Sequence, residues 1–226
     1  MNPILHIDGF EGTARLFPLP DFVMMPHVLK NFHIFEPRYR ELVRDSLSKD
    51  KLIAMVLPRQ GWEKDYEGTF PIYTVGCLAS IHEHEKLEDG RYNILLRGLC
   101  RIELEHELLT HTLYRQAKVK LQPDPHVMDE GRLRNQLEKE VLPWLSEEGE
   151  GRSQFIKLMH SQAPLGTIVD VVSFALPILS DWKQQLLEIF NVPDRVRKLC
   201  ELLHSVEPFK QNTSNPRKNP PDFSTN

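Results

Sequence analysis

The spacing of apolar residues changes character at Pro123-Asp124-Pro125, and this change constrains the fold more than any other feature of the chain. Before it, short apolar runs alternate with Gly, Pro and Asp, which is typical of strands joined by tight turns. After it, apolar residues recur with the period of amphipathic helices. The sequence therefore predicts a β-rich first half, a helical second half and a domain boundary between them.

The clearest strand covers residues 94–104, where alternate apolar residues share one face. The residues expected on that face are Ile94, Leu96, Gly98, Cys100, Ile102 and Leu104. Gly98 interrupts the apolar face, and a glycine inside a strand indicates a bend or a bulge. Such a bend allows a sheet to curl into a barrel.

Other strands are predicted over 52–57, 75–81 and 115–121. Gly90 supplies the positive φ that a hairpin between His84 and Tyr92 needs. One helix interrupts this half, because apolar residues repeat at helical spacing over 39–47 and Pro37 suits a first helical turn.

Helical spacing in the second half predicts four or five helices, with breaks at Pro164 and Pro177. Asp170 lies in an apolar helix, where a buried carboxylate needs a partner. We expect Arg195 or Lys183 from a neighbouring helix to provide it, as a structural pair.

The charge balance argues against a large nucleic-acid interface. The chain has 28 basic and 32 acidic residues, so its net charge is −4, and no strong positive field attracts a phosphate backbone. The three cysteines, Cys77, Cys100 and Cys200, include no CxxC pair, and neither a disulfide framework nor a zinc ribbon is readable. Neither an export signal nor a membrane span is recognisable, and we expect a cytoplasmic protein.

Three segments match a known pattern. Near the start the chain reads RLFPLPDFVMMPHVLKNFHIFEPRYRELVRDSL. It continues with VGCLASIHEHEKLEDGRYNILLRGLCRIEL and closes with WKQQLLEIFNVPDRVRKLCELL. These segments resemble the opening, the G-x-x-A-x-I and G-x-x-R strands, and the K-Q-x-L-L-E ending of the Lon N-terminal (LON substrate-binding) domain family. The resemblance covers about residues 15–203 and is closest to the stand-alone bacterial type.

The resemblance implies an α+β fold, in which a PUA-like β-barrel with one inserted helix is followed by an α-helical bundle. We therefore expect an N-terminal extension over 1–14, the barrel over 15–125, the bundle over 126–206 and a disordered tail over 207–226. Composition also favours disorder in the tail, because Asn, Pro, Ser and Lys leave little to bury. In Lon proteases this region precedes ATPase and peptidase modules and helps to capture unfolded polypeptides.

The catalytic motifs of such enzymes do not occur in the sequence. The G-x-x-x-x-G-K-[ST] phosphate loop is absent, and no segment resembles the Ser-Lys peptidase module. A G-x-S-x-G elbow and a cysteine beside a histidine are absent too. We therefore expect that the protein is not an enzyme and has no catalytic residue, no metal and no cofactor, even where a relative's name says Lon peptidase.

Candidate polypeptide-binding residues lie in and near an apolar segment before the inserted helix. This segment carries more apolar bulk than a loop needs, and flexible methionines beside aromatic rings suit an adaptable surface. An arginine on the long strand can set the direction of a bound chain. The candidates are Phe22, Met24, Met25, His27, Phe32 and Arg97. The alternative is that Met24, Phe32 and Phe35 fill the core. Exposure of Phe22 and Met25 would then be the strongest support for a binding surface.

The run His82-Glu83-His84-Glu85 is the most metal-like cluster, because alternation on a strand places both imidazoles on one face. The spacing of residues in the sequence assigns no third metal ligand, so we interpret this run as the solvent-exposed end of a strand.

The expected function is non-catalytic recognition of unfolded polypeptide segments, or of a protein partner, in protein quality control. Two alternatives stay open: an adaptor for a separate ATP-dependent protease, and an RNA-binding PUA-like module. The acidic balance argues against RNA, so we expect no nucleic-acid partner, and no membrane partner either. The sequence does not fix the oligomeric state.

Overall fold

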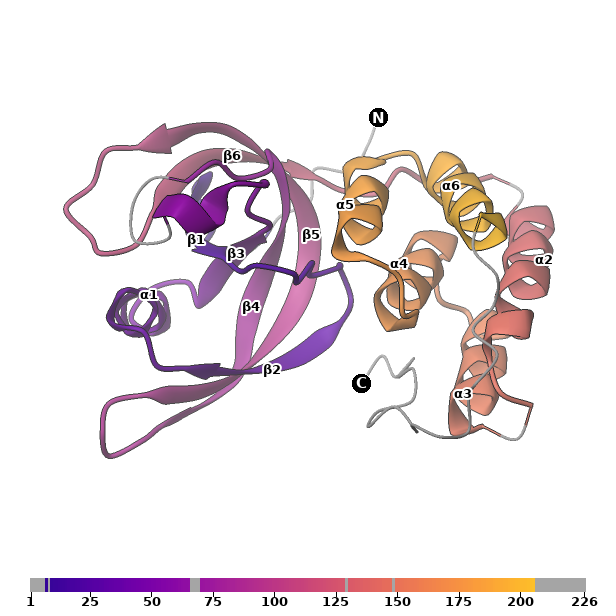
Figure 1. Cartoon of the computed structure of the whole chain (residues 1–226), viewed down its shortest axis with the longest axis horizontal. Coiled ribbons are helices and arrows are strands. Elements are labelled where there is room, and N and C mark those ends of the chain that lie inside the picture. Colours follow the sequence, from indigo (N-terminus) through magenta and orange to yellow (C-terminus); the bar gives the residue numbers. More distant parts are fainter. Residues whose placement is uncertain (1–6, 8, 66–69, 129, 148, 206–226) are drawn as a thin grey trace. The chain divides into compact units, whose positions relative to one another are not determined.

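The computed structural model describes residues 7, 9–65, 70–128, 130–147 and 149–205 and shows a mixed α and β chain (Figure 1). Within these ranges it contains one six-stranded sheet and six α-helices. The chain divides into two compact units, Met1–Pro123 and Asp124–Asn226. The predicted disordered tail, 207–226, lies outside the described residues, as do residues 1–6 and 8 of the predicted N-terminal extension.

Unit 1 contains all six strands and the first helix. The strands are β1 (Thr13–Pro18), β2 (Leu29–Ile34), β3 (Leu52–Val56), β4 (Val75–Lys86), β5 (Tyr92–Leu108) and β6 (Gln116–Gln122). The helix α1 (Pro37–Leu47) follows β2, and the 3-10 helix η1 (Trp62–Asp65) follows β3. The strand order is β2-β5-β4-β3-β1-β6, and β6 also pairs with β5. Five strands therefore form a closed ring of pairings, and β2 is an edge strand beside β5.

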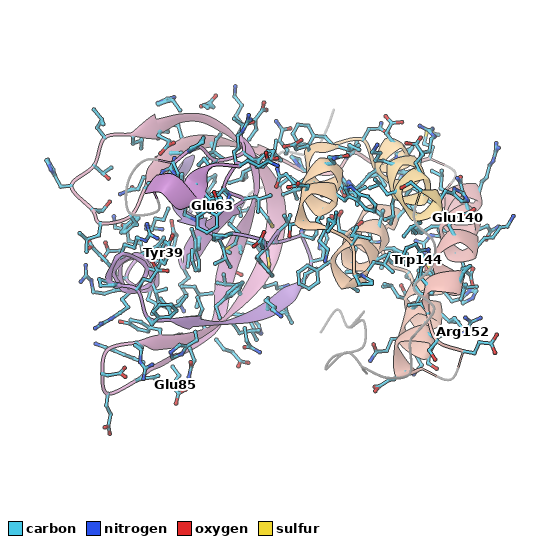
Figure 2. The ribbon with its side chains drawn as sticks, viewed as in Figure 1. Tyr39, Glu63, Glu85, Glu140, Trp144 and Arg152 are labelled. Carbon is cyan, nitrogen blue, oxygen red and sulfur yellow. The ribbon has the colours of Figure 1, made fainter. Side chains whose placement is uncertain are left out.

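Apolar side chains cover both faces of the sheet. An inner cluster has all its buried members on strands of the ring and includes Ala14, Leu16, Ala54, Leu78, Ile102 and Val119. An outer cluster lies between the sheet and α1 and includes Phe17, Met24, Tyr39, Leu42, Ile53 and Leu96. Of these, Figure 2 labels Tyr39, which comes from α1. Successive residues of β3 alternate between the two clusters, which explains why this strand reads as a continuous apolar run.

Strand β5 does not keep one apolar face. Its pairing with β4 shifts register next to Gly98, where Leu99 is an extra residue. Before the shift Leu96 belongs to the outer cluster, whereas Ile102 after it belongs to the inner cluster. The expectation of a single apolar face over 94–104 is therefore wrong, because a shift of one residue turns every later side chain to the other face. The bulge itself lies beside the glycine that predicts it.

The connection between β1 and β2 crosses β5 at Gly98. The His27 N–H donates to the Gly98 oxygen at 2.8 Å, and the Gly98 N–H donates to the Val28 oxygen at 2.9 Å. A Cβ at position 98 would collide with the Met25 carbonyl oxygen and lie 3.1 Å from the Cα of Pro26. His27 has a φ of 67°, in the left-handed region that favours glycine. The crossing therefore needs a residue without a side chain at position 98.

Unit 2 consists of helices. They are α2 (Glu130–Val141), α3 (Glu150–Met159), α4 (Leu165–Ala175), α5 (Ser180–Glu188) and α6 (Val192–His204), with the 3-10 helix η2 (Leu142–Trp144) after α2. The Asn191 side chain caps α6 by accepting a hydrogen bond from the Asp194 N–H at 3.0 Å. In the part of the chain that the structure describes, no helix is long and apolar enough to cross a membrane.

A buried arginine joins three segments of unit 2. Arg195 of α6 is fully buried and donates to Asp170 of α4 at 3.0 Å and to Asp124 at 2.7 Å. Its Nε also donates to the Ile189 oxygen at 3.0 Å. Asp170 is likewise fully buried, so the predicted structural pair of Asp170 with a neighbouring cation is confirmed, and Arg195 supplies that cation. Because Asp124 is the first residue of unit 2, the same guanidinium fixes the start of this unit to its helices.

The three cysteines are thiols, and all three are buried. Burial raises the pKa of the Cys200 thiol to about 11, which leaves little reactive thiolate at pH 8. We expect a disulfide reagent at pH 8 to label the native protein slowly and to titrate all three thiols at once in denaturant. Rapid labelling of a native thiol would contradict the burial of Cys77, Cys100 and Cys200.

Candidate functional site

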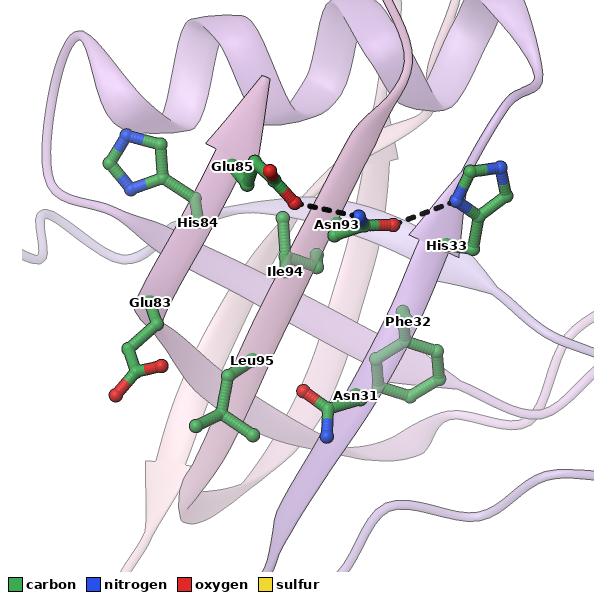
Figure 3. Close-up of a pocket in the computed structure, with 9 residues that line it drawn as sticks. All are labelled: Asn31, Phe32, His33, Glu83, His84, Glu85, Asn93, Ile94 and Leu95. Atoms are coloured by element: carbon green, nitrogen blue, oxygen red, sulfur yellow. Dashed lines mark hydrogen bonds between the residues drawn. The ribbon is translucent and has the colours of Figure 1, made fainter. Parts of the chain in front are cut away.

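A groove of about 610 Å³ opens across β2, β5 and β4 in unit 1 (Figure 3). Two rows of side chains cross the three strands here, because the pairing registers align Asn31 with Leu95 and Glu83, and His33 with Asn93 and Glu85. These residues alternate with Ile94, which belongs to the outer cluster. The groove therefore lies on the polar face of these strands, and the opposite face is apolar and packs in the outer cluster.

The second row is a continuous chain of hydrogen bonds. An Arg91 nitrogen lies 3.2 Å from His33 Nε2, and His33 Nδ1 lies 2.8 Å from the Asn93 oxygen. Because arginine can only donate, Nε2 accepts and Nδ1 carries the hydrogen, which fixes the imidazole tautomer. The Asn93 amide nitrogen then donates to Glu85 at 2.9 Å. These hydrogen bonds orient the Asn93 amide and hold the Glu85 carboxylate close to β5.

The groove carries negative charge. Glu83 and Glu85 are exposed, and neither forms an ion pair with a cation among the described residues. Arg91, beside the groove, binds Asp89 at 2.6 Å, and its hydrogen bond lowers the pKa of that carboxyl group below its ordinary value. Arg91 is thus already paired with Asp89, and the carboxylates of Glu83 and Glu85 remain available to a ligand.

An exposed aromatic ring extends this surface at the end of β2. Phe35 is 60% exposed, and its ring stacks on His33 with centroids 6.3 Å apart. Single exposed apolar residues are ordinary, but a ring beside a groove adds a contact for an apolar side chain of a ligand.

A second bulge decides which residues of the histidine-glutamate run face the groove. The pairing of β4 with β5 shifts between Ile81 and Glu83, and His82 is the extra residue. Glu83 and Glu85 then fall in the two rows of groove side chains, while His84 pairs opposite Ile94 and also lines the groove (Figure 3). Within residues 7–205, as far as the structure describes them, no three His, Cys, Asp or Glu side chains are grouped to hold a metal ion.

The structure brings some of the predicted site residues together and separates others. Phe22 and Phe32 meet edge to face with ring centroids 5.2 Å apart, and both pack against the outer cluster. Met24 is a member of that cluster and is 1% exposed. Arg97 is exposed on β5, on the strand face that carries the groove but outside the groove itself.

Two details correct the sequence-based expectations about exposure. Met25 is fully buried, so it does not provide the exposed side chain that would support the candidate site, and its carbonyl lies at the crossing over Gly98. Phe35, expected to fill the core in the alternative interpretation, is exposed instead. Flexible apolar residues suit both a core and a surface, and the sequence pattern does not separate the two.

Sequence reasoning missed the polar residues of the groove. Asn31, His33 and Asn93 come from strands about sixty positions apart. The local signal was present, because Asn31 and His33 flank Phe32 with the alternation of a half-buried strand. Only the register between β2 and β5 shows that these side chains meet.

A family model described as the ATP-dependent protease La (LON) substrate-binding domain matches residues 13–205. The Lon protease of Anaeromyxobacter dehalogenans is 24% identical over 207 residues, which covers 89% of this chain and 24% of the relative. The Lon protease of Dictyoglomus thermophilum is 28% identical over 196 residues, covering 83% of this chain and 24% of the relative. The chain therefore spans about a quarter of the length of the curated relatives it matches.

Two solved structures share the fold. The N-terminal domain of Mycobacterium avium complex Lon protease matches with a TM-score of 0.69 and 16% identity, over 86% of this chain and 100% of that chain. A Lon N-terminal domain protein from Xanthomonas campestris matches with a TM-score of 0.61 and 19% identity, over 84% of this chain and 97% of that chain. At these identities the likeness concerns the fold alone.

Proposed function

Because the chain belongs to the LON substrate-binding domain family, we propose that it recognises unfolded polypeptide segments or a protein partner without catalysing a reaction. The observation that carries this proposal is the family match over residues 13–205. The geometry of unit 1 supports it, since a groove beside an edge strand is a common way to bind an extended chain.

The finer points of the fold follow the same family. We propose that the closed ring of strand pairings is a PUA-like β-barrel over 15–125, followed by the helical bundle over 126–206. The pairing of β6 with both β1 and β5 supports a closed barrel, since closure leaves no free edge within the ring.

The cellular role is a proposal as well. A stand-alone recognition protein of cytoplasmic quality control fits the family, and an adaptor for a separate ATP-dependent protease would use the same surfaces. The candidate contact residues remain Phe22, Phe32, His27 and Arg97, together with the buried Met24 and Met25, which would act by shaping the segment rather than by touching a ligand.

The test is a fluorescence anisotropy titration of a labelled, permanently unfolded polypeptide with the pure protein. We expect the anisotropy to rise at micromolar protein, and the label to stay intact on a gel after incubation with ATP and magnesium. A labelled RNA of similar length should show no rise. No rise with the polypeptide up to high micromolar protein would contradict general polypeptide capture, and cleavage of the label would contradict a non-catalytic role.

One variant pair locates the contact. Phe22→Ser removes a half-buried ring from the apolar segment that precedes α1, and we expect weaker binding of the unfolded polypeptide. Leu179→Ser in unit 2 removes an apolar side chain that is 66% exposed and serves as the matched control. Equal losses in both variants would speak against a contact at Phe22.

A further inference from the structure

The backbone of β2 has a free edge. β2 stands at the end of the strand order and pairs only with β5 among the described strands (Figure 1). The Gly98 N–H donates to the Val28 oxygen, and in an antiparallel ladder every second residue bonds to the same neighbour. Lys30, Phe32 and Ile34 therefore bond to β5. The N–H and C=O groups of Leu29, Asn31 and His33 point to the free edge, where another strand can pair with them.

The groove lies beside this edge, on the face that the Asn31 and His33 side chains share. A strand added to β2 would lie about 4.8 Å from it, and β5 lies at the same spacing on its other side. Asn93 holds the Glu85 carboxylate over β5. A long side chain that crosses β2 from the added strand therefore meets this carboxylate, and Glu83 lies in the neighbouring row.

We propose that an extended peptide adds to the free edge of β2 and places a lysine or arginine side chain in the groove, against Glu85, while Glu83 on β4 adds negative charge to the same groove. This inference rests on the proposed function and names its ligand class: a strand-forming segment with one basic residue. Backbone hydrogen bonds supply affinity without regard to sequence, and the two carboxylates supply the preference for a cation.

Charge complementarity favours such a peptide over a second copy of this chain. On β2 itself, the side chains that face the groove come from Leu29, Asn31 and His33, and none of them is a lysine or arginine. Lys30 pairs with Leu96, so its side chain lies on the face of β2 opposite to the groove. Two copies joined through β2 would therefore leave both carboxylates without a cation, whereas a basic peptide neutralises them.

The first experiment isolates the backbone edge. Asn31→Pro removes an N–H that faces the edge and keeps the bonds to β5, whereas Asn31→Ala removes the side chain and keeps the N–H. The probe is a labelled ten-residue peptide of Val, Thr and Ser with one central lysine. We expect about tenfold weaker binding for Asn31→Pro than for Asn31→Ala, which serves as the reference for loss of the side chain alone, with similar melting temperatures. Equal binding by both variants would overturn strand addition.

The second experiment isolates the charge. Three labelled peptides differ only in a central Lys, Gln or Glu, and the Lys peptide is expected to bind about fivefold more tightly than the Gln peptide at low salt. The double variant Glu83→Gln and Glu85→Gln should lose this preference and still bind the Gln peptide as wild type does. The glutamine side chain still accepts the Asn93 hydrogen bond, so the fold is preserved. A lysine preference that persists in the double variant would overturn the proposed contact.

The two levels of the proposal fail differently. If wild type and Asn31→Pro bind the unfolded polypeptide equally well, polypeptide recognition stands and the β2 site is wrong. If wild type binds neither the unfolded polypeptide nor the lysine peptide, the proposed function fails together with the site. Should Asn31→Pro unfold, His33→Pro tests the same edge from its other end, and the charge experiment does not depend on either variant.

Discussion

Arg195→Met is expected to lower the free energy of unfolding of unit 2 by about 3–5 kcal/mol, because it removes the cation from a fully buried ion pair. The methionine fills part of the volume but leaves Asp170 charged in the interior and Asp124 without its 2.7 Å contact. The loss is measured by urea denaturation followed through tryptophan fluorescence, since Trp144 and Trp182 both lie in this unit.

The matched control is Arg197→Met. Arg197 belongs to the same helix, but its ion pair with Asp194 is exposed on both sides, so we expect a loss of at most about 0.5 kcal/mol. Adding Asp170→Asn to Arg195→Met removes the buried charge and should recover part of the lost stability. Equal effects of the two arginine substitutions would show that burial of the pair does not matter.

Gly98→Ala is expected to destabilise unit 1 by about 3 kcal/mol, near the upper end of the usual cost of overpacking. The new Cβ would meet the Met25 carbonyl group, and backbone atoms cannot rotate away as a flexible side chain can. The crossing of the β1–β2 connection must then move, and the hydrogen bonds that His27 and Val28 exchange with Gly98 weaken. Far-UV circular dichroism during urea denaturation measures the loss.

Gly131→Ala is the control for this substitution. Gly131 lies in α2 with open space around its missing Cβ, so alanine should stabilise the helix by about 0.5–1 kcal/mol. If the free energy of unfolding of Gly98→Ala lies within about 1 kcal/mol of the wild-type value, the crossing is more adaptable than its geometry indicates.

Local patterns predicted many elements of the fold, although strands β1 and β2 were not among them. The predicted helix over 39–47 after Pro37 is α1, which begins at that proline. Gly90 has the positive φ of 80° expected of the hairpin turn. The change in the spacing of apolar residues at Pro123-Asp124-Pro125 coincides with the division between the two units. Each of these features depends on a few neighbouring residues, which is why periodicity and turn chemistry suffice.

The parts that the sequence did not predict depend on register. An extra residue in a strand, such as Leu99 or His82, leaves no mark in a one-dimensional alternation, yet it reassigns the faces of everything beyond it. The groove has the same origin, because His33 and Asn93 meet only through the pairing of β2 with β5. The burial of Met25 follows from a chain crossing that no local window contains.

The closure of the strand ring also bears on how the polypeptide folds. Strand β1 pairs with β6 through Thr13 and Lys118, more than a hundred positions away, and such distant contacts slow folding because a long loop must close first. While the chain is being synthesised, β1 has no antiparallel neighbour until β6 has left the ribosome. Strand edges of β1 and β5 are open during that time and can pair with other chains. We therefore expect refolding to be slow and to lose yield as the protein concentration rises.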